Sequence, residues 1–121
     1  GGRWLSLEAL HAPVPEDEAA VADWAVAASA EANSAFFDGC LSVPSVQVDK
    51  SWHLRGGAGG AHPQSCCIVL DPSVHSSLRD LCSTLVHEML HLEVGDADNS
   101  EEHGERFIKR CLELNEQMAG V

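Results

Sequence analysis

Two histidines and a glutamate stand at a spacing that can hold and use a metal ion. His87, Glu88 and His91 form the pattern H-E-x-x-H. On a helix, residues four apart lie one turn apart on the same face, so both imidazoles can reach one ion. The glutamate between them lies beside that ion and can take a proton from a water molecule. The pattern therefore predicts a zinc site with hydrolytic chemistry, in which Glu88 is the general base.

The residues around the motif predict the helix that it needs, from about Ser76 to Val94. His87 and His91 would lie on one side of this helix, beside Asp80 and Thr84. The opposite side would face the core, because apolar residues cover about 100° of its surface. These residues are Leu78, Leu81, Cys82, Leu85, Met89 and Leu92.

A catalytic zinc ion needs a third protein ligand and one open position for water. Val94 and Ala97 stand where a metzincin has Gly and His, which excludes that class. The next histidine, His103, could return toward the first pair after a loop of about seven residues. We predict His103 as the third ligand, because neutral imidazole suits zinc. An acidic ligand is the open alternative, from Glu93, Asp96, Asp98, Glu101, Glu102 and Glu105.

The other elements predict a small α+β domain. A helix should run from about residue 16 to 38, with Gly39 as its stop. Val46 and Val48 alternate with polar residues as in a strand. Residues 66–70 are an apolar run typical of a buried strand, and a last helix should cover about 104–118. The glycine-rich residues 56–60 indicate either a flexible loop or a place where the backbone approaches something closely.

Several segments together resemble one protein family. His87-Glu88-x-x-His91 followed by His103-Gly104-x-x-Phe107 resembles the SprT-like zinc metallopeptidases, the Spartan-type family. Residues 33–41 are similar to that family's N-x-x-F-F-x-G-x-L segment, and residues 67–70 to the strand before its active-site helix. The similarity covers about residues 30–112. The acidic, short loop before His103 departs from the pattern, and a separate zinc-binding DNA module is missing from this sequence.

The resemblance implies a zincin-like domain at residues 16–121, after an N-terminal arm at 1–15. It has an N-terminal helix, a short sheet of about three strands, the active-site helix and a C-terminal helix. It implies a zinc endopeptidase with one zinc ion per chain, acting on proteins that are bound or crosslinked to DNA, with DNA as activator. The alternative function is a non-catalytic zinc-containing module that binds protein or DNA.

The substrate would lie extended along residues 66–70 if that strand is an edge, because an edge strand offers free backbone hydrogen-bonding groups. Cys67, Ile68 and Val69 are then the candidate substrate-binding residues. The chain has no Tyr, so no tyrosine can stabilise the oxyanion. Zinc itself must do so, or a helper from among His53, His62 and Arg55.

Composition limits the partners. Lys and Arg number 7 and Asp and Glu 19, for a net charge of −12. This balance argues against the chain alone being a strong nucleic-acid binder, because phosphate binding needs a basic surface. Lys50 and Arg55 flank Trp52-His53, which indicates either a small stacking and phosphate patch or a packed tryptophan at a strand end.

The sequence also bears on the compartment. No stretch approaches the roughly 18 apolar residues of a membrane span. The first residues lack the apolar region of a signal peptide. The five cysteines include no C-x-x-C pair, which is typical of reduced thiols. We therefore expect a protein of the nucleus or cytoplasm, with no membrane partner.

Overall fold

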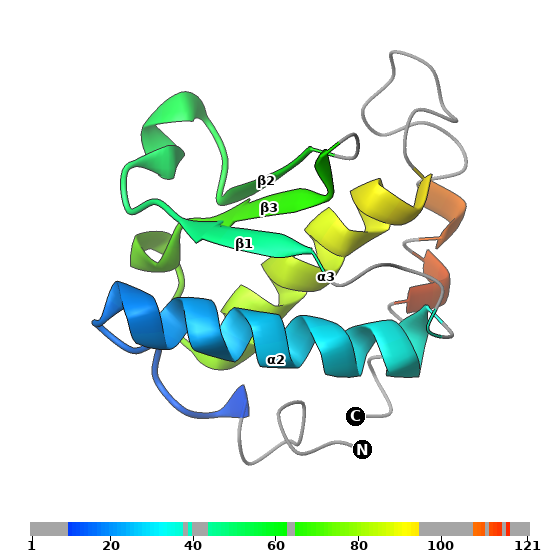
Figure 1. The fold of residues 1–121 in the computed structure, drawn as a ribbon, viewed down its shortest axis with the longest axis horizontal. Coiled ribbons are helices and arrows are strands. Elements are labelled where there is room, and N and C mark those ends of the chain that lie inside the picture. Colours follow the sequence, from blue (N-terminus) through cyan, green and yellow to red (C-terminus); the bar gives the residue numbers. More distant parts are fainter. Residues whose placement is uncertain are drawn as a thin grey trace.

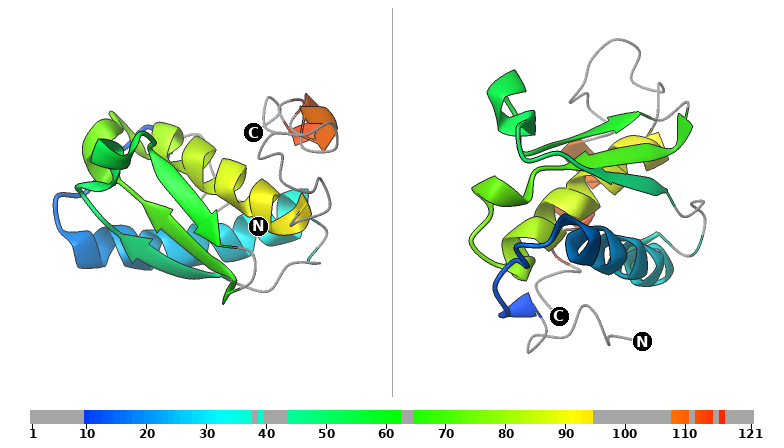
Figure 2. Two further views of the ribbon diagram at one scale, coloured as in Figure 1. Left: turned by 90° about the horizontal axis from the view of Figure 1, so that it is seen from above. Right: turned by 60° about the vertical axis from the view of Figure 1, so that its left-hand side comes forward.

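The computed structural model describes residues 10–37, 39, 44–62, 65–94, 108–110, 112–114 and 116. Within them, a three-stranded sheet packs on two long helices, α2 (Glu18–Phe36) and α3 (Leu78–Val94). Both helices cover the same face of the sheet, so the domain has two layers (Figures 1 and 2). The predicted small α+β domain with about three strands is confirmed.

The sheet contains β1 (Ser45–Val48), β2 (Gly59–His62) and β3 (Cys67–Leu70), in the spatial order β1-β3-β2. β1 pairs with β3 in parallel, and β2 pairs with β3 antiparallel. β3 is therefore the central strand, so the condition on which a substrate was expected to lie along it, that it forms a sheet edge, is not met. Since β1 and β2 occupy both of its sides, Cys67, Ile68 and Val69 have no free strand edge to offer a substrate.

The ends of α2 follow from its sequence. The Asp17 side chain caps the start by accepting a hydrogen bond from the N–H of Ala19 at 3.2 Å. At the other end, the N–H groups of Phe37 and Gly39 both donate to the carbonyl of Asn33. Gly39 has a φ of +72°, a left-handed conformation that glycine adopts at no steric cost. The predicted stop at Gly39 is confirmed.

The core lies between the sheet and the two helices. The predicted apolar stripe of α3 is buried, with Leu92 partly buried at its end. Val86 and Leu90 are buried too, because α3 is packed against both the sheet and α2. Among the described residues, neither helix combines the length and the apolar character that crossing a membrane requires.

Part of the predicted N-terminal arm packs on the domain. Leu10 is 3% exposed and belongs to the core, and Ala12 and Val14 lie against it. The carbonyl of Ala12 accepts a hydrogen bond of 2.9 Å from the N–H of Leu78, the first residue of α3. The arm therefore helps to fix the start of the helix that carries the H-E-x-x-H motif.

The described residues near the C-terminus are helical and are held by Arg110. Its guanidinium pairs with Glu93 of α3 at 2.7 Å and with Glu113 at 3.1 Å. It also donates a hydrogen bond of 2.6 Å to the carbonyl of Phe36, at the end of α2. One side chain thus joins the last helix to the ends of both long helices.

We predict that Arg110→Met lowers the free energy of unfolding by roughly 1–3 kcal/mol, because it removes four charge-assisted hydrogen bonds from a largely covered site. Glu113→Gln is the control. The carboxylate of Glu113 is half exposed, so its replacement should lower the free energy of unfolding by less than about 1 kcal/mol. Urea unfolding of both variants checks the prediction, and equal losses would contradict the joining role of Arg110.

Candidate metal site

His87, Glu88 and His91 come together on α3 as the sequence predicts. Each offers one ligand atom, and these atoms lie within 4.8 Å of one another. The two imidazole rings are 5.0 Å apart between centroids, with an angle of 80° between their planes. Two neutral imidazoles and a carboxylate are a donor set that suits zinc and related divalent ions. The described residues of this group could therefore hold a metal ion.

The group is partly shielded from water. His87 and His91 are half-buried, and Glu88 is only 6% exposed. A buried carboxylate keeps its charge only where charges or hydrogen bonds compensate for lost water, and a divalent cation supplies such a charge. The burial of Glu88 therefore fits a role beside a metal ion.

The start of β2 approaches the helix at this group. A Cβ atom on Gly59 would lie 2.8 Å from the carbonyl oxygen of Val69, 3.0 Å from Cγ2 of Thr84 and 3.4 Å from Oε2 of Glu88. Only glycine leaves room for that approach. The structure thus decides between the two interpretations of the glycine-rich run in favour of a close backbone contact. Gly59 also begins a strand that sequence analysis had assigned to a loop.

The neighbouring glycine meets a tryptophan on the other face of the sheet. A Cβ atom on Gly60 would lie 2.6 Å from Cζ2 of Trp52, and the Arg55 guanidinium lies 5.1 Å from the centroid of the same ring. Because successive residues of a strand point to opposite faces, His62 shares the face of Gly60, away from α3. The structure therefore does not bring His62 or Arg55 to the metal-binding group.

The third proposed helper, His53, is bound to a buried carboxylate. Asp71, fully buried after β3, accepts hydrogen bonds from the N–H and the Nδ1–H of His53, at 2.8 and 2.6 Å. It also accepts from the N–H and hydroxyl of Ser73, at 2.9 and 2.5 Å. Burial acts to raise the pKa of Asp71, but these hydrogen bonds outweigh it and lower that pKa to about 2. His53 is thereby fixed at the end of β3.

A second histidine links this end of the sheet to α3. His75 contacts the carbonyl oxygen of Asp71 through Nδ1 and the hydroxyl of Thr84 through Nε2, both at 2.7 Å. Thr84 lies one helical turn before Glu88. Sequence analysis singled out neither Asp71 nor His75. Asp71-Pro72 is indistinguishable from an ordinary turn after a strand.

The third metal ligand is not decided by the described residues. His103 lies outside them, as do all the acidic alternatives except Glu93. Glu93 is paired with Arg110 through both carboxylate oxygens, at 2.7 and 3.4 Å. This ion pair argues against Glu93 as a ligand, and His103 stays a prediction.

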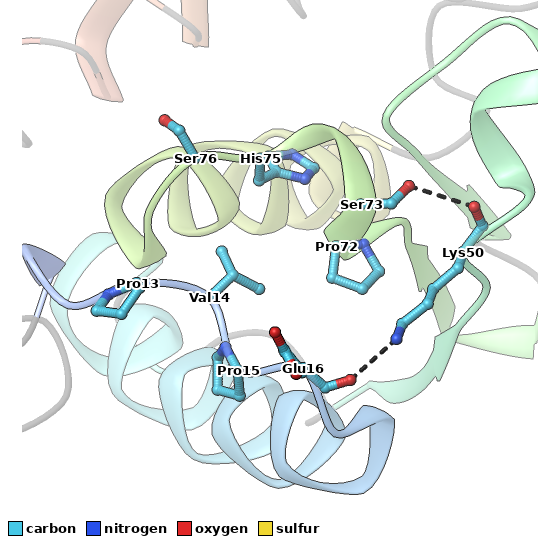
Figure 3. A pocket seen from close by; sticks show the side chains of 9 residues that line it. All are labelled: Pro13, Val14, Pro15, Glu16, Lys50, Pro72, Ser73, His75 and Ser76. Carbon is cyan, nitrogen blue, oxygen red and sulfur yellow. Dashed lines mark hydrogen bonds between the residues drawn. The ribbon is translucent and has the colours of Figure 1, made fainter.

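A cleft of about 270 Å³ lies between residues 13–16, Lys50 and residues 72–76, the segment that precedes α3 (Figure 3). There, Lys50 donates a hydrogen bond of 2.9 Å to the carbonyl of Glu16, and its own carbonyl accepts one from Ser73. Lys50 is therefore engaged in this cleft, while Arg55 lies over Trp52. Of the two interpretations of this region, the packed tryptophan has the better support. The cleft is lined by Pro13, Val14, Pro15, Glu16, Lys50, Pro72, Ser73, His75 and Ser76.

The sequence was compared with protein-family models, curated proteins and solved structures. The sequence model of the SprT-like family matches residues 26–121 of this chain. That range includes α2 from residue 26 onward, the three described strands, α3 and the residues of the candidate metal site. Comparisons with curated proteins and with solved structures found no match.

We predict that Gly59→Ala lowers the free energy of unfolding by roughly 1–3 kcal/mol, because the added methyl group overlaps a backbone oxygen that cannot move aside. It should also weaken metal binding by displacing Glu88 or β2. Gly57→Ala is the control, since its nearest contact would be an ordinary 3.4 Å. Thermal unfolding and zinc titration of both variants test this. Equal behaviour of the two would contradict the close contact at Gly59.

Asp71 should make stability depend on pH in acid. Its pKa falls from 3.8 to about 2 on folding. Its ionised form therefore stabilises the fold above pH 3.8, and that contribution is lost as the pH falls from 3.8 toward 2. The shift is worth on the order of 2 kcal/mol. Urea unfolding between pH 2 and 6 should show a weaker pH dependence in Asp71→Asn than in the wild type. The same slope in both proteins would refute the assignment.

Proposed function

Since this chain belongs to the SprT-like family, we propose that it is a zinc-dependent endopeptidase with His87, Glu88 and His91 in its active site. The observation that carries this proposal is the buried Glu88 between two half-buried histidines, next to β2. A purely structural zinc site needs ligands but no buried carboxylate beside them. The alternative, a non-catalytic zinc-containing binding module, does not call for a general base beside the zinc ligands.

His87 and His91 would hold the zinc ion, with His103 as the predicted third ligand. Zinc, when bound, supplies a Lewis acid that polarises the scissile carbonyl and makes water a stronger nucleophile at neutral pH. Glu88 takes the proton of the attacking water and then passes it to the nitrogen of the leaving amine. The cover that β2 gives to Glu88 limits the access of other water molecules to this carboxylate.

The substrate would pair with β2 rather than β3. Among the residues that the structure describes, β2 is the edge strand on the side of the metal-binding group, and it packs on α3. An extended peptide beside β2 could exchange backbone hydrogen bonds with it, as peptides do at other exposed sheet edges. Such a peptide would pass next to Gly59, and therefore next to the carboxylate of Glu88.

The finer parts of the proposal come from the family resemblance. They are cleavage of DNA-bound or DNA-crosslinked proteins, activation by DNA, and a location in the nucleus or cytoplasm. The free cysteines Cys67 and Cys82 are compatible with a reducing compartment. The net charge of −12 and the engagement of Lys50 give DNA little to bind on the described surface. DNA is therefore an arm of the experiment below.

We predict that Glu88→Gln abolishes cleavage of an unstructured protein such as casein, with at least a 100-fold loss of rate, while zinc binding is retained. Glutamine has the shape of glutamate but cannot accept the proton of water. Purified wild type and variant would be loaded with one equivalent of zinc. Cleavage would be followed on gels, with and without single-stranded DNA.

His87→Ala is the matched control, because it should lose both zinc and cleavage. Equal cleavage by wild type and Glu88→Gln would exclude Glu88 as the base. Zinc binding without any cleavage by the wild type, with or without DNA, would favour the binding module. Stimulation of the wild type by DNA would support the DNA-activated form of the proposal.

A further inference from the structure

We propose that His75 is a positioning residue for the active site: its hydrogen bond to Thr84 sets the rotation of α3 that aims Glu88 at a peptide on β2. This inference rests on the proposed peptidase function. His75 itself lies outside the H-E-x-x-H motif, in the connection between β3 and α3.

The two hydrogen bonds of His75 determine which ring nitrogen donates and which accepts in the neutral imidazole. The carbonyl oxygen of Asp71 can only accept, so Nδ1 carries the proton and donates across 2.7 Å. In the neutral ring Nε2 then has no proton, and it accepts one from the Thr84 hydroxyl, also across 2.7 Å. Both nitrogen atoms are thus used, and the ring connects the end of the sheet to the side of α3.

One end of this connection is held in place by several hydrogen bonds. Asp71 is fully buried, and its carboxylate accepts four hydrogen bonds from His53 and Ser73. Its N–H donates to the carbonyl of Ala58, directly before β2. The residue that holds His75 therefore also holds the start of the edge strand. Through Asp71, His75 therefore fixes the position of α3 relative to β2.

The other end of the connection lies on the metal-binding face of α3. At 100° per residue, Thr84, His87, Glu88 and His91 fall within about 100° of the helix circumference. Cγ2 of Thr84 and Oε2 of Glu88 both lie under Gly59, within 3.0 and 3.4 Å of the place of a Cβ atom there. The Thr84 methyl group thus packs against β2, while its hydroxyl is held by His75.

Rotation of α3 would leave the zinc ligands on α3 and Glu88 correctly arranged with one another, because all three share the helix. It would change their position relative to β2 and to any ligand from another segment. At about 5 Å from the helix axis, a rotation of 10–15° moves a side-chain atom by about 1 Å. A displacement of that size can cost about 100-fold in rate. A single hydrogen bond at Thr84 can therefore matter for catalysis more than for folding.

The experiment uses the zinc-loaded chain and removes only the hydroxyl. Thr84→Val keeps a methyl group against Gly59 but cannot donate to His75. We expect a 10- to 100-fold lower kcat for cleavage of an unstructured protein, with KM within about threefold of wild type. Thr84→Ser keeps the hydroxyl and should restore most of the lost rate. Ser83→Ala removes an exposed hydroxyl from the neighbouring residue and should leave cleavage unchanged.

A second readout does not depend on cleavage. Co²⁺ bound in place of zinc absorbs visible light according to the arrangement of its ligands. Its spectrum should change in Thr84→Val and be close to wild type in Thr84→Ser, because the third ligand comes from outside α3 in the proposed site. Thermal unfolding would show whether each variant is folded at the assay temperature.

The outcomes separate the inference from the proposed function. If the wild type cleaves and Thr84→Val equals it in kcat and in Co²⁺ spectrum, the positioning role is refuted and the peptidase stands. If Thr84→Ser is as slow as Thr84→Val, the methyl contact matters and the role of the His75 hydrogen bond is refuted. If the wild type binds Co²⁺ but cleaves nothing, the proposed function fails. The spectra of the two variants then decide whether His75 still positions the metal ligands.

Discussion

The close contact between β2 and α3 at Gly59 is the constraint on which the candidate site depends. Two layers of secondary structure normally stand apart by the length of their side chains. Here one strand residue has no side chain, so its backbone reaches the helix residues Thr84 and Glu88 directly. The glutamate is buried as a result, although it belongs to a helix face that also carries two half-buried histidines. The chemistry available to Glu88 follows from this packing, because shielding from water strengthens its interaction with a nearby cation.

The buried carboxylate of Asp71 connects the sheet to the segment that leads into α3. Asp71 carries a negative charge without any exposure, which is tolerable only because four hydrogen bonds replace the lost water. Those donors belong to the loop before β2 and to the turn before α3. The carboxylate therefore joins the segments on either side of the site. Asp71 is thus an acidic residue that contributes to the architecture and not to the acidic surface.

Local features of the fold could be predicted from the sequence, and long-range pairing could not. The helix around His87 and His91 and the stop at Gly39 depend on neighbouring residues and were predicted correctly. β2 was missed because a Gly-Gly-Ala segment has little strand propensity; it forms only because β3 pairs with it. The same pairing puts β3 in the centre. The partners of Asp71 come from residues up to 18 positions away, so no local pattern marks it.

The composition of β2 has a consequence for selectivity. Gly59 and Gly60 carry no side chains, and Ala61 has only a methyl group. A chain lying alongside this edge would meet peptide groups with almost nothing projecting between them. Binding there would depend on the extended conformation of the substrate backbone and only slightly on its amino-acid sequence. A native protein, whose strands are already paired and whose helices have satisfied their own amides, cannot present that shape. Such a strand edge would distinguish unfolded from folded chains, and only secondarily one amino acid from another.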